Sequence, residues 1–320
     1  MKAAVVKGAG ERPVHMEFEP PRAMPGHSLI DVAASALSRI AQGRASGTHY
    51  SSDRRYPFVV GVDGVGRRDD GQRVYFFGTP APFGAMAERT IVPDTQCVPL
   101  PDGLDDVTAA AIAIPGMSSW AALTERARLV AGETVLVNGA TGTSGRLAVR
   151  IAKHLGAAKV IATGRNAAAL DALLNAGADA VVSLQQDDAH LVRALEPHLR
   201  AGVDVVLDYL WGASAQTLLV AAAKAAPDGR RLRFVQIGSI GGADVLLPGA
   251  VLRATAIELM GSGLGSVPLP RLLASVRCVF DAAGPARLAV ETRTVPLSAV
   301  GEHWGDTDSL VRTVFTMRGE

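Results

Sequence analysis

The chain has 320 residues, of which 48% are hydrophobic, and its formal net charge is +1. This composition excludes intrinsic disorder, and the near-zero charge with few aromatic residues gives no electrostatic support for nucleic-acid binding. No apolar run looks long enough to span a bilayer, so no membrane partner is expected. Two cysteines, Cys97 and Cys278, cannot form a disulfide framework and favour a reduced, cytoplasmic setting.

The first part of the chain has the pattern of a compact, mostly β unit. Short segments of alternating apolar and polar residues are separated by proline and glycine, which is typical of strands. The predicted strands are Lys2–Lys7, Ser28–Ala33, Val59–Val65, Arg73–Phe77 and Glu88–Pro93. An apolar, helix-like segment, Asp105–Leu123, then connects this unit to a region with a different pattern.

Strands and helices alternate from residue 133 onwards. The predicted strands are Val135–Asn138, Val160–Thr163, Ala180–Ser183, Val203–Asp208 and Arg233–Gly238. The predicted helices between them are Arg146–Leu155, Ala167–Ala176, Ala189–Leu199 and Ala213–Ala226. Parallel strands joined by crossover helices form a doubly wound sheet that is buried on both faces. The fold class expected here is therefore α/β.

The last part of the chain is expected to complete the sheet and then return to the first unit. A strand at Ile257–Gly261 is expected at the sheet edge, followed by a helix near Leu269–Ala283 and a strand near Ala289–Val295. The predicted segments are thus residues 1–116, 117–256 and 257–320. An exposed sheet edge is a liability unless it is paired, which favours a homodimer.

A glycine-spaced turn between the first strand and helix of the α/β region carries most of the functional information. Its residues are Gly139, Ala140, Thr141, Gly142, Thr143, Ser144 and Gly145. Gly139 suits a tight turn, Gly142 lets the backbone approach a pyrophosphate, and Gly145 lets the helix pack on the strand. The positive end of the helix would then face the phosphates. An ordinary strand-to-helix turn is the alternative interpretation.

The end of the second α/β strand indicates which coenzyme binds. A dinucleotide fold places its ribose-binding residue about twenty residues after the glycine turn, and an acidic residue there binds the 2′-hydroxyl of NAD. This chain has Gly164, Arg165 and Asn166 instead. Gly164 makes room, and the Arg165 guanidinium offers a fork of donors to a 2′-phosphate, which favours NADPH. A solvated surface arginine is the alternative.

A series of short motifs resembles the zinc-free quinone oxidoreductase branch of the medium-chain dehydrogenase/reductase superfamily. The motifs, in chain order, are Met1-Lys-Ala-Ala-Val-Val, Gly61-Val-Asp-Gly-Val-Gly66, Gly71-Gln-Arg-Val-Tyr75, Gly84-Ala-Met-Ala-Glu88, Pro115-Gly-Met-Ser-Ser-Trp-Ala-Ala-Leu123, the glycine turn, Ala176-Gly-Ala-Asp179 and Val203–Asp208. The resemblance implies a Rossmann domain inserted into a GroES-like, mainly β catalytic domain. It covers nearly the whole chain.

The metal ligands of the zinc-dependent relatives are missing from this sequence. Ser38 stands where the first ligand cysteine of those relatives falls, and Val62 stands where their ligand histidine falls. Two cysteines cannot supply a structural zinc site either. The sequence therefore predicts no metal.

The resemblance also implies where further residues lie. Ser118 should approach the nicotinamide side of the coenzyme. The remaining expected coenzyme neighbours are Asp208, Tyr209, Ile237, Gly238, Ser239, Gly263 and Leu264. For Asp208, a helix-capping role is an equal alternative. One departure is Leu184, where the family often has a tyrosine near the adenine phosphate.

Hydride transfer to a quinone or to an α,β-unsaturated carbonyl compound fits a site without a metal or an obvious acid–base pair. The substrate oxygen takes the charge, and the protein supplies positioning and a dry cleft. Ser38 and Tyr50 are the candidate catalytic residues, although a rim tyrosine is the plainer interpretation of Tyr50. The alternative function is an NADPH-binding sensor or structural protein with little turnover, like the relative zeta-crystallin.

Overall fold

The computed structural model describes residues 1–49, 51–52, 55–306 and 308–317. The chain divides into two compact units. Unit 1 comprises residues 1–114 and 289–320, and unit 2 comprises residues 115–288. This division differs from the predicted boundaries, because the strand and helix expected after residue 256 belong to unit 2 up to residue 288.

Unit 2 is built around a six-stranded parallel sheet. In spatial order its strands are β11 (Ala180–Ser183), β10 (Lys159–Gly164), β9 (Thr134–Asn138), β12 (Val205–Asp208), β13 (Leu232–Gln236) and β14 (Ile257–Gly261). The chain first moves outward from β9 to β11 and then returns to place β12 on the other side of β9. The strand order therefore reverses between β9 and β12, which makes this the topological switch point of the sheet.

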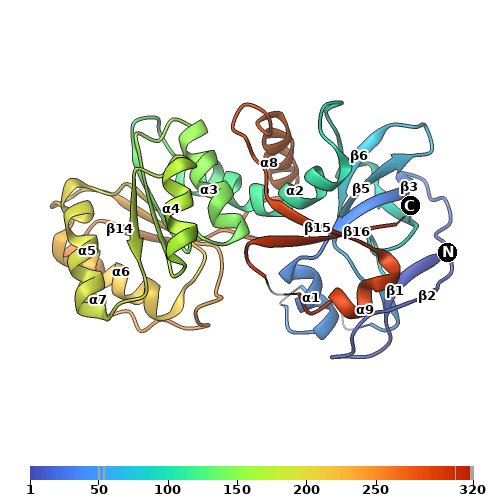
Figure 1. Ribbon diagram of the computed structural model, residues 1–320, viewed down its shortest axis with the longest axis horizontal. Coiled ribbons are helices and arrows are strands. Elements are labelled where there is room, and N and C mark those ends of the chain that lie inside the picture. Colours follow the sequence, from blue (N-terminus) through green and yellow to red (C-terminus); the bar gives the residue numbers. More distant parts are fainter. Residues whose placement is uncertain (50, 53–54, 307, 318–320) are drawn as a thin grey trace. The chain divides into compact units, whose positions relative to one another are not determined.

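Helices cover the parallel sheet, as expected for strands that are buried on both faces. They are α3 (Thr143–His154), α4 (Ala167–Asn175), α5 (Asp188–Ala201), α6 (Gly212–Ala225) and α7 (Gly249–Ala254). The helix α8 (Leu269–Asp281) of the same unit instead packs its Val279 against Gly116. Figure 1 shows α3 and α4 in green and α5 to α7 in yellow to orange around the sheet. Side chains from α5, α6 and α7 pack into one apolar cluster with strand residues such as Leu136 and Phe234.

Unit 1 is mainly β and holds two sheets. The smaller has the order β2 (Val14–Glu17), β1 (Lys2–Val6) and β4 (Phe58–Val59). The larger has the order β15 (Glu291–Pro296), β16 (Val311–Thr316), β3 (His27–Ala36), β5 (Asp63–Arg68), β6 (Arg73–Phe77) and β8 (Cys97–Pro99), and β7 (Arg89–Pro93) also pairs with β3. The short helical elements are α1 (Arg39–Ser46), η1 (Asp94–Gln96), η3 (Leu297–Ala299) and α9 (Val300–His303).

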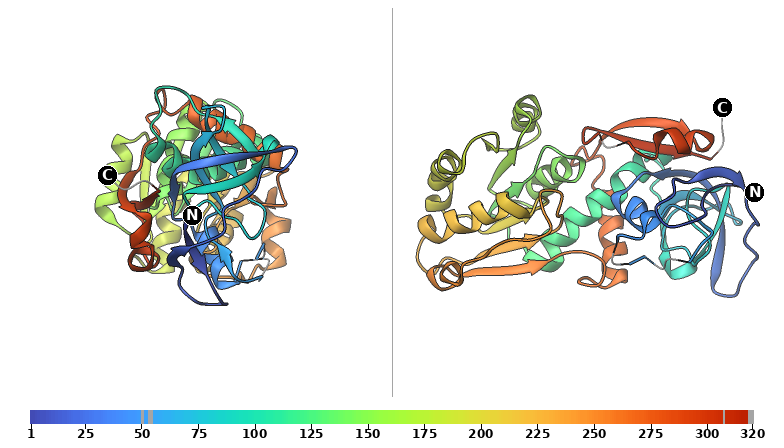
Figure 2. Two further views of the ribbon diagram at one scale, coloured as in Figure 1. Left: turned by 90° about the vertical axis from the view of Figure 1, so that its right-hand side faces the viewer. Right: turned by 90° about the horizontal axis from the view of Figure 1, so that it is seen from below.

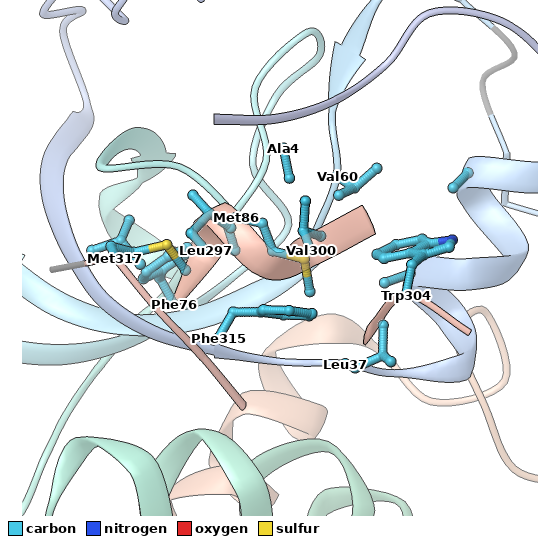
Figure 3. Packing of buried hydrophobic residues seen from close by; sticks show 14 of the residues in the cluster. Ala4, Leu37, Val60, Phe76, Met86, Leu297, Val300, Trp304, Phe315 and Met317 are labelled. Carbon is cyan, nitrogen blue, oxygen red and sulfur yellow. The ribbon is translucent and has the colours of Figure 1, made fainter. Parts of the chain in front are cut away.

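The core of unit 1 joins segments from opposite ends of the chain. Ala4 from β1 and Phe76 from β6 pack in one cluster with Val300, Trp304 and Phe315 (Figure 3). The first strand, in blue, and the last strand, in red, therefore belong to the same unit (Figure 2). Burying these apolar side chains holds the C-terminal segment to the N-terminal sheet, since roughly 25 cal/mol is gained per Å² of buried apolar surface.

One long helical run leads from unit 1 into unit 2. It consists of α2 (Asp106–Ala121) and a π-helical continuation, η2 (Ala122–Ala127). Among the described residues it is the one helix that is long and apolar enough, by length and composition, to cross a membrane. However, 72% of its most apolar window is buried inside the protein, as in a core helix.

Most predicted elements are confirmed, and the exceptions have identifiable causes. The predicted strand Val59–Val65 is two strands, β4 and β5, because Gly61 between them has φ +96° and turns the chain. Strand β12 begins at Val205 rather than Val203. Strands β2, β8 and β16 and helix α1 were not predicted, since they are short or lack a clear period.

Candidate functional site

The structure brings most of the predicted coenzyme residues to one edge of the parallel sheet. Carboxyl ends of parallel strands meet at the same edge, and ligands bind in the crevice outside it at the switch point. The glycine turn follows β9, Gly164 ends β10, Asp208 ends β12, and Ile237 follows β13. Residues far apart in sequence are therefore neighbours at the edge where a dinucleotide fold binds its ligand.

The three glycines of the turn differ in what surrounds them. Gly139 has φ +86°, a backbone conformation that side chains rarely adopt. A Cβ atom added to Gly145 would lie 2.5 Å from Cα of Ala140, so this glycine permits the close packing of helix and turn. A Cβ atom added to Gly142 would meet nothing within 4 Å. The space beside Gly142 is therefore open, as a backbone that approaches a pyrophosphate requires.

Helix α3 begins directly at this open position. Its N-cap is Gly142, which has no side chain to cap the first N–H groups, and its first turn contains no acidic residue. The positive end of a helix dipole without an internal acidic partner favours a bound anion. The turn and α3 thus fit the pyrophosphate of a dinucleotide coenzyme.

The space at Gly164 is used differently from the prediction. A Cβ atom added to Gly164 would lie 2.4 Å from Cγ2 of Thr141, so the side chain of Thr141 fills the room that the sequence assigned to a phosphate. Arg165 is exposed, and no ion pair joins it to another described residue. Asn166 accepts a hydrogen bond of 3.0 Å from the backbone of Ala169 and caps α4. Of the three residues, Arg165 is the one that carries an exposed positive charge.

Asp208 holds the switch point together through its carboxylate. It is fully buried and accepts hydrogen bonds from the side-chain amide of Asn138 at 2.8 Å and from the backbone N–H groups of Leu210 and Trp211. Burial raises the pKa of Asp208, and the three donors oppose that shift. The carboxylate thus closes the turn between β12 and α6, but it is not the N-cap of α6, which is Trp211 without a side-chain cap.

Asn138 extends this network to the neighbouring strand. Its side-chain oxygen accepts hydrogen bonds from the hydroxyls of Thr163 at 2.7 Å and Ser214 at 3.1 Å. Thr163 also accepts a hydrogen bond from the backbone of Gly139, the first residue of the turn. The network was missed at the sequence level, because a polar residue at the end of a buried strand shows its partners only after the strands are ordered.

Tyr209 connects the long helix to the start of α3. Its hydroxyl lies 2.7 Å from the hydroxyl of Ser119, which also contacts the carbonyl of Ser144 at 3.2 Å. Ser118 on the same helix donates to the carbonyl of Pro115. Burial raises the pKa of Tyr209, while hydrogen bonds with Ser119 and Ser118 oppose the rise. Through these hydrogen bonds, Tyr209 joins the helix segment that carries Ser118 to the first turn of α3.

The loops after β13 and β14 lie at the same carboxyl ends of the parallel strands. Ile237 and Gly238 donate backbone hydrogen bonds to the carbonyl of Asp208, and a Cβ atom on Gly238 would lie 2.6 Å from the carbonyl oxygen of Tyr209. Gly263 and Leu264 follow β14 in a turn in which Gly263 donates to the hydroxyl of Ser266.

A pocket of about 440 Å³ lies at the ends of β13 and β14. Its lining residues are Trp211, Gln236, Ser239, Ala243, Leu259, Met260 and Gly261. Ser239 is thus the one predicted coenzyme neighbour that lines it. Apolar walls with a few polar groups are usual for small-molecule sites.

The two candidate catalytic residues belong to unit 1. Ser38 is buried, and its hydroxyl accepts a hydrogen bond of 3.1 Å from the backbone of Ala41, which caps α1. The sequence did not predict this helix or its cap. Tyr50 lies outside the described residues. The nearby Tyr56 donates to the carbonyl of Ala45 at 3.3 Å.

The described part of the chain contains no cluster of three or more His, Cys, Asp or Glu side chains that could hold a metal ion. Both cysteines are free thiols, with Cys97 in unit 1 and Cys278 in unit 2. Burial raises the pKa of Cys97 to about 11, so this thiol is protonated at neutral pH.

Comparison with known proteins agrees with this fold. The family described as zinc-binding dehydrogenase matches residues 145–285. A probable NADPH-dependent quinone reductase, tdiC, from Emericella nidulans is 27% identical and is matched over 93% of this chain and 94% of its own length. The trans-enoyl reductase pgmF from Aspergillus terreus is 29% identical over 43% of this chain and 39% of its own length.

Solved structures resemble the whole chain. The quinone oxidoreductase from Thermus thermophilus, which was also solved in complex with NADPH, is 26% identical, with a TM-score of 0.77 over 99% of this chain and 100% of that one. A doubly wound sheet with this glycine turn, joined to a mainly β unit, defines a pyridine-nucleotide-dependent dehydrogenase or reductase. The chain belongs to the quinone oxidoreductase-like branch of the medium-chain dehydrogenase/reductase superfamily.

Proposed function

We propose that this protein is an NADPH-dependent oxidoreductase that transfers a hydride to a quinone or an α,β-unsaturated carbonyl compound without a metal. The observation that carries the proposal is the glycine turn at the switch point, with open space at Gly142 and the exposed Arg165 at the end of the next strand. The NADPH named for tdiC and for the Thermus thermophilus enzyme supports the choice of coenzyme.

The role proposed for each residue follows from its position. NADPH, when bound, supplies the hydride. The glycine turn and α3 bind its pyrophosphate, and Arg165 neutralises its 2′-phosphate. Ser118, held in place through Ser119 and Tyr209, borders the nicotinamide side. The network from Asp208 through Asn138 to Thr163 keeps the turn rigid.

The substrate provides the remaining chemistry. Its carbonyl oxygen takes up the negative charge when the hydride arrives, and one proton completes the reduced product. The protein therefore needs to supply only position, exclusion of water and access to a proton. Ser38 and Tyr50 of unit 1 are the proposed proton donors or hydrogen-bond donors to that oxygen. Both substrate classes appear among the relatives, as a quinone reductase and a trans-enoyl reductase.

The direct test is the purified protein with NADPH and a panel of quinones and enones, with loss of NADPH absorbance as the measurement. We expect turnover with at least one acceptor, and less with NADH. Tight NADPH binding without turnover of any acceptor would support the sensor alternative. Absence of both binding and turnover would overturn the proposal.

The proposed catalytic residues are tested by Ser38→Ala and Tyr50→Phe. Loss of kcat with an unchanged NADPH Kd is expected for a residue that acts on the substrate. Because Ser38 also caps α1, its variant should lose about 1 kcal/mol of stability as well. Unfolding measurements therefore accompany the kinetics.

We also propose that the protein is a cytoplasmic homodimer that pairs along β14. This strand is at the edge of the parallel sheet, and its Leu259 is 38% exposed. Backbone groups on an open edge favour pairing with a second copy. Light scattering should give twice the chain mass, and Leu259→Lys should shift it towards the monomer. A wild-type chain that remains monomeric at all concentrations would refute the dimer.

A further inference from the structure

The segment that contains the glycine turn carries positive side chains but no negative ones. Between Glu133 and Asp171 the sequence contains no acidic residue. It contains five cationic residues, Arg146, Arg150, Lys153, Lys159 and Arg165. This stretch comprises β9, the glycine turn, α3 and β10. A region of one sign of charge around a ligand-binding edge attracts an anion.

Three of the five cations either bind another group of the protein or lie far from the glycine turn. Lys153 forms an ion pair with Asp179 at 2.6 Å, and Arg150 donates to the backbone carbonyl of Arg287. Lys159 is the first residue of β10, so it lies at the amino ends of the parallel strands, whereas the glycine turn lies at their carboxyl ends. Arg146 and Arg165 remain, and neither forms an ion pair with another residue that the structure describes.

Arg146 occupies an electrostatically unfavourable position on α3. It lies in the first turn after the Gly142 N-cap, where the positive end of the helix dipole disfavours a positive side chain. Its Nε donates a hydrogen bond of 3.0 Å to the carbonyl of Thr141. That single bond uses one of the five guanidinium donors. A cation placed there with donors to spare is explained if an anion completes its environment.

Thr141 contacts both Arg146 and the residue that precedes Arg165. The carbonyl of Thr141 holds Arg146, and the methyl group of Thr141 lies against Gly164, the residue before Arg165. The backbone of Ala140 also donates to the carbonyl of Thr163 at 2.7 Å, which fixes the loop on the end of β10. The base of Arg146 and the base of Arg165 therefore border the place where the coenzyme ribose is expected.

We propose that Arg146 is a second residue that determines coenzyme specificity, and that it binds the 2′-phosphate of NADPH together with Arg165. This inference rests on the proposed function. A phosphate offers three acceptor oxygens and favours charge-assisted bonds from more than one guanidinium. The bond to Thr141 orients the Arg146 guanidinium in advance, so less side-chain freedom is lost on binding.

The test measures binding rather than turnover. Dissociation constants of NADPH, NADH, 2′,5′-ADP and 5′-AMP are measured by calorimetry for the wild type, Arg146→Ala and Arg146→Lys. Arg146→Ala should weaken NADPH and 2′,5′-ADP by about 10- to 100-fold, the usual value of a charge-assisted bond. NADH and 5′-AMP should change by less than about 3-fold, within the range of weak screened charges. Arg146→Lys keeps the charge without the fork and should give an intermediate loss.

Arg150→Ala is the matched control, because it removes the same charge one turn further along α3. It should leave all four dissociation constants within about 3-fold. Equal weakening of NADPH and NADH by Arg146→Ala would place the residue on the pyrophosphate, and no weakening would remove it from the site. Either result overturns the inference while the proposed function stands. A wild type that binds neither NADPH nor 2′,5′-ADP would refute the proposed function itself.

Discussion

The side-chain amide of Asn138 donates a hydrogen bond of 2.8 Å to the carboxylate of Asp208, and this bond joins the last residues of β9 and β12. These are the two strands between which the sheet order reverses. The backbone N–H of Tyr209 also donates to the carbonyl of Asn138 at 3.1 Å, so side-chain and backbone bonds act together where the two loops diverge. The side-chain bond thus helps to fix the distance between the glycine turn and the loop that carries Tyr209.

Removing this carboxylate should weaken the fold. Asp208→Ala leaves the buried amide of Asn138 and the N–H groups of Leu210 and Trp211 without their acceptor. We expect a loss of about 2–4 kcal/mol in the free energy of unfolding, measured by urea titration. Asp228→Ala, at an exposed position in the same unit, is the control and should cost less than about 0.5 kcal/mol. Equal effects of the two variants would contradict the structural role of Asp208.

The glycines of the turn should separate folding from coenzyme binding. Gly145→Ala places a methyl group 2.5 Å from Cα of Ala140, so it should destabilise the protein by about 1–3 kcal/mol. Gly142→Ala meets no atom within 4 Å and should leave unfolding unchanged while it weakens NADPH. Thermal unfolding and NADPH titration of both variants check this. Normal NADPH affinity in Gly142→Ala would argue against a pyrophosphate at that position.

Arg165 should distinguish the two coenzymes. Arg165→Ala removes the exposed guanidinium after β10 and should weaken NADPH by about 10- to 100-fold, with little change for NADH. Fluorescence titration with each coenzyme measures the effect. Arg193→Ala, at an exposed position on α5, is the control for loss of one surface charge. A similar loss of affinity for NADPH and NADH would show that Arg165 does not bind the 2′-phosphate.

The hydroxyl pair Tyr209 and Ser119 should act as a unit. Tyr209→Phe removes the 2.7 Å hydrogen bond but keeps the ring, and Ser119→Ala removes its partner. Each should cost about 1 kcal/mol of stability, and the double variant should cost less than the sum. NADPH affinity should fall a few-fold with no change in the preference over NADH. Strict additivity in the double-mutant cycle would indicate that the bond contributes nothing.

Asp63 should make the stability of unit 1 depend on pH. Burial raises the pKa of Asp63 from 3.8 to about 7, although the Arg312 charge and the Tyr75 hydroxyl oppose the rise. The folded state therefore holds a proton that the unfolded state releases near pH 4, so this contribution is present below about pH 4 and is lost as the pH rises towards 7. The loss is on the order of a few kcal/mol at most.

The matched variant for this prediction is Asp63→Asn, which cannot ionise. Its stability relative to the wild type should increase from pH 5 to pH 8, because the wild type alone must accommodate a buried carboxylate at the higher pH. Urea unfolding at several pH values measures the difference. A gap between the two proteins that does not change with pH would show that Asp63 titrates normally.

Local patterns predicted the regular elements well where the pattern was strong. Strands β6, β11 and β14 have the same bounds in the sequence prediction and in the structure. The prediction was wrong where one glycine divided a continuous apolar run, as at Gly61. It missed β16, which pairs with β15 and also with β3 hundreds of residues away, because no local period marks a strand that is stabilised by its neighbours in the sheet.

The amino-acid sequence by itself determined the order of strands and helices, the glycine turn, the arginine at the coenzyme edge and the lack of zinc-ligand spacing. These features depend on residue type and on short spacings, which a linear chain displays directly. The structure decided that Asp208 closes the turn after β12, that Ser38 caps α1, that Thr141 fills the space at Gly164, and that Arg146 donates to the carbonyl of Thr141. The contact between Thr141 and Gly164 joins segments that approach one another only when the chain packs, so spacing along the sequence carries no record of it. The other relations are local, but their hydrogen-bond partners depend on backbone conformations that the spacing does not reveal.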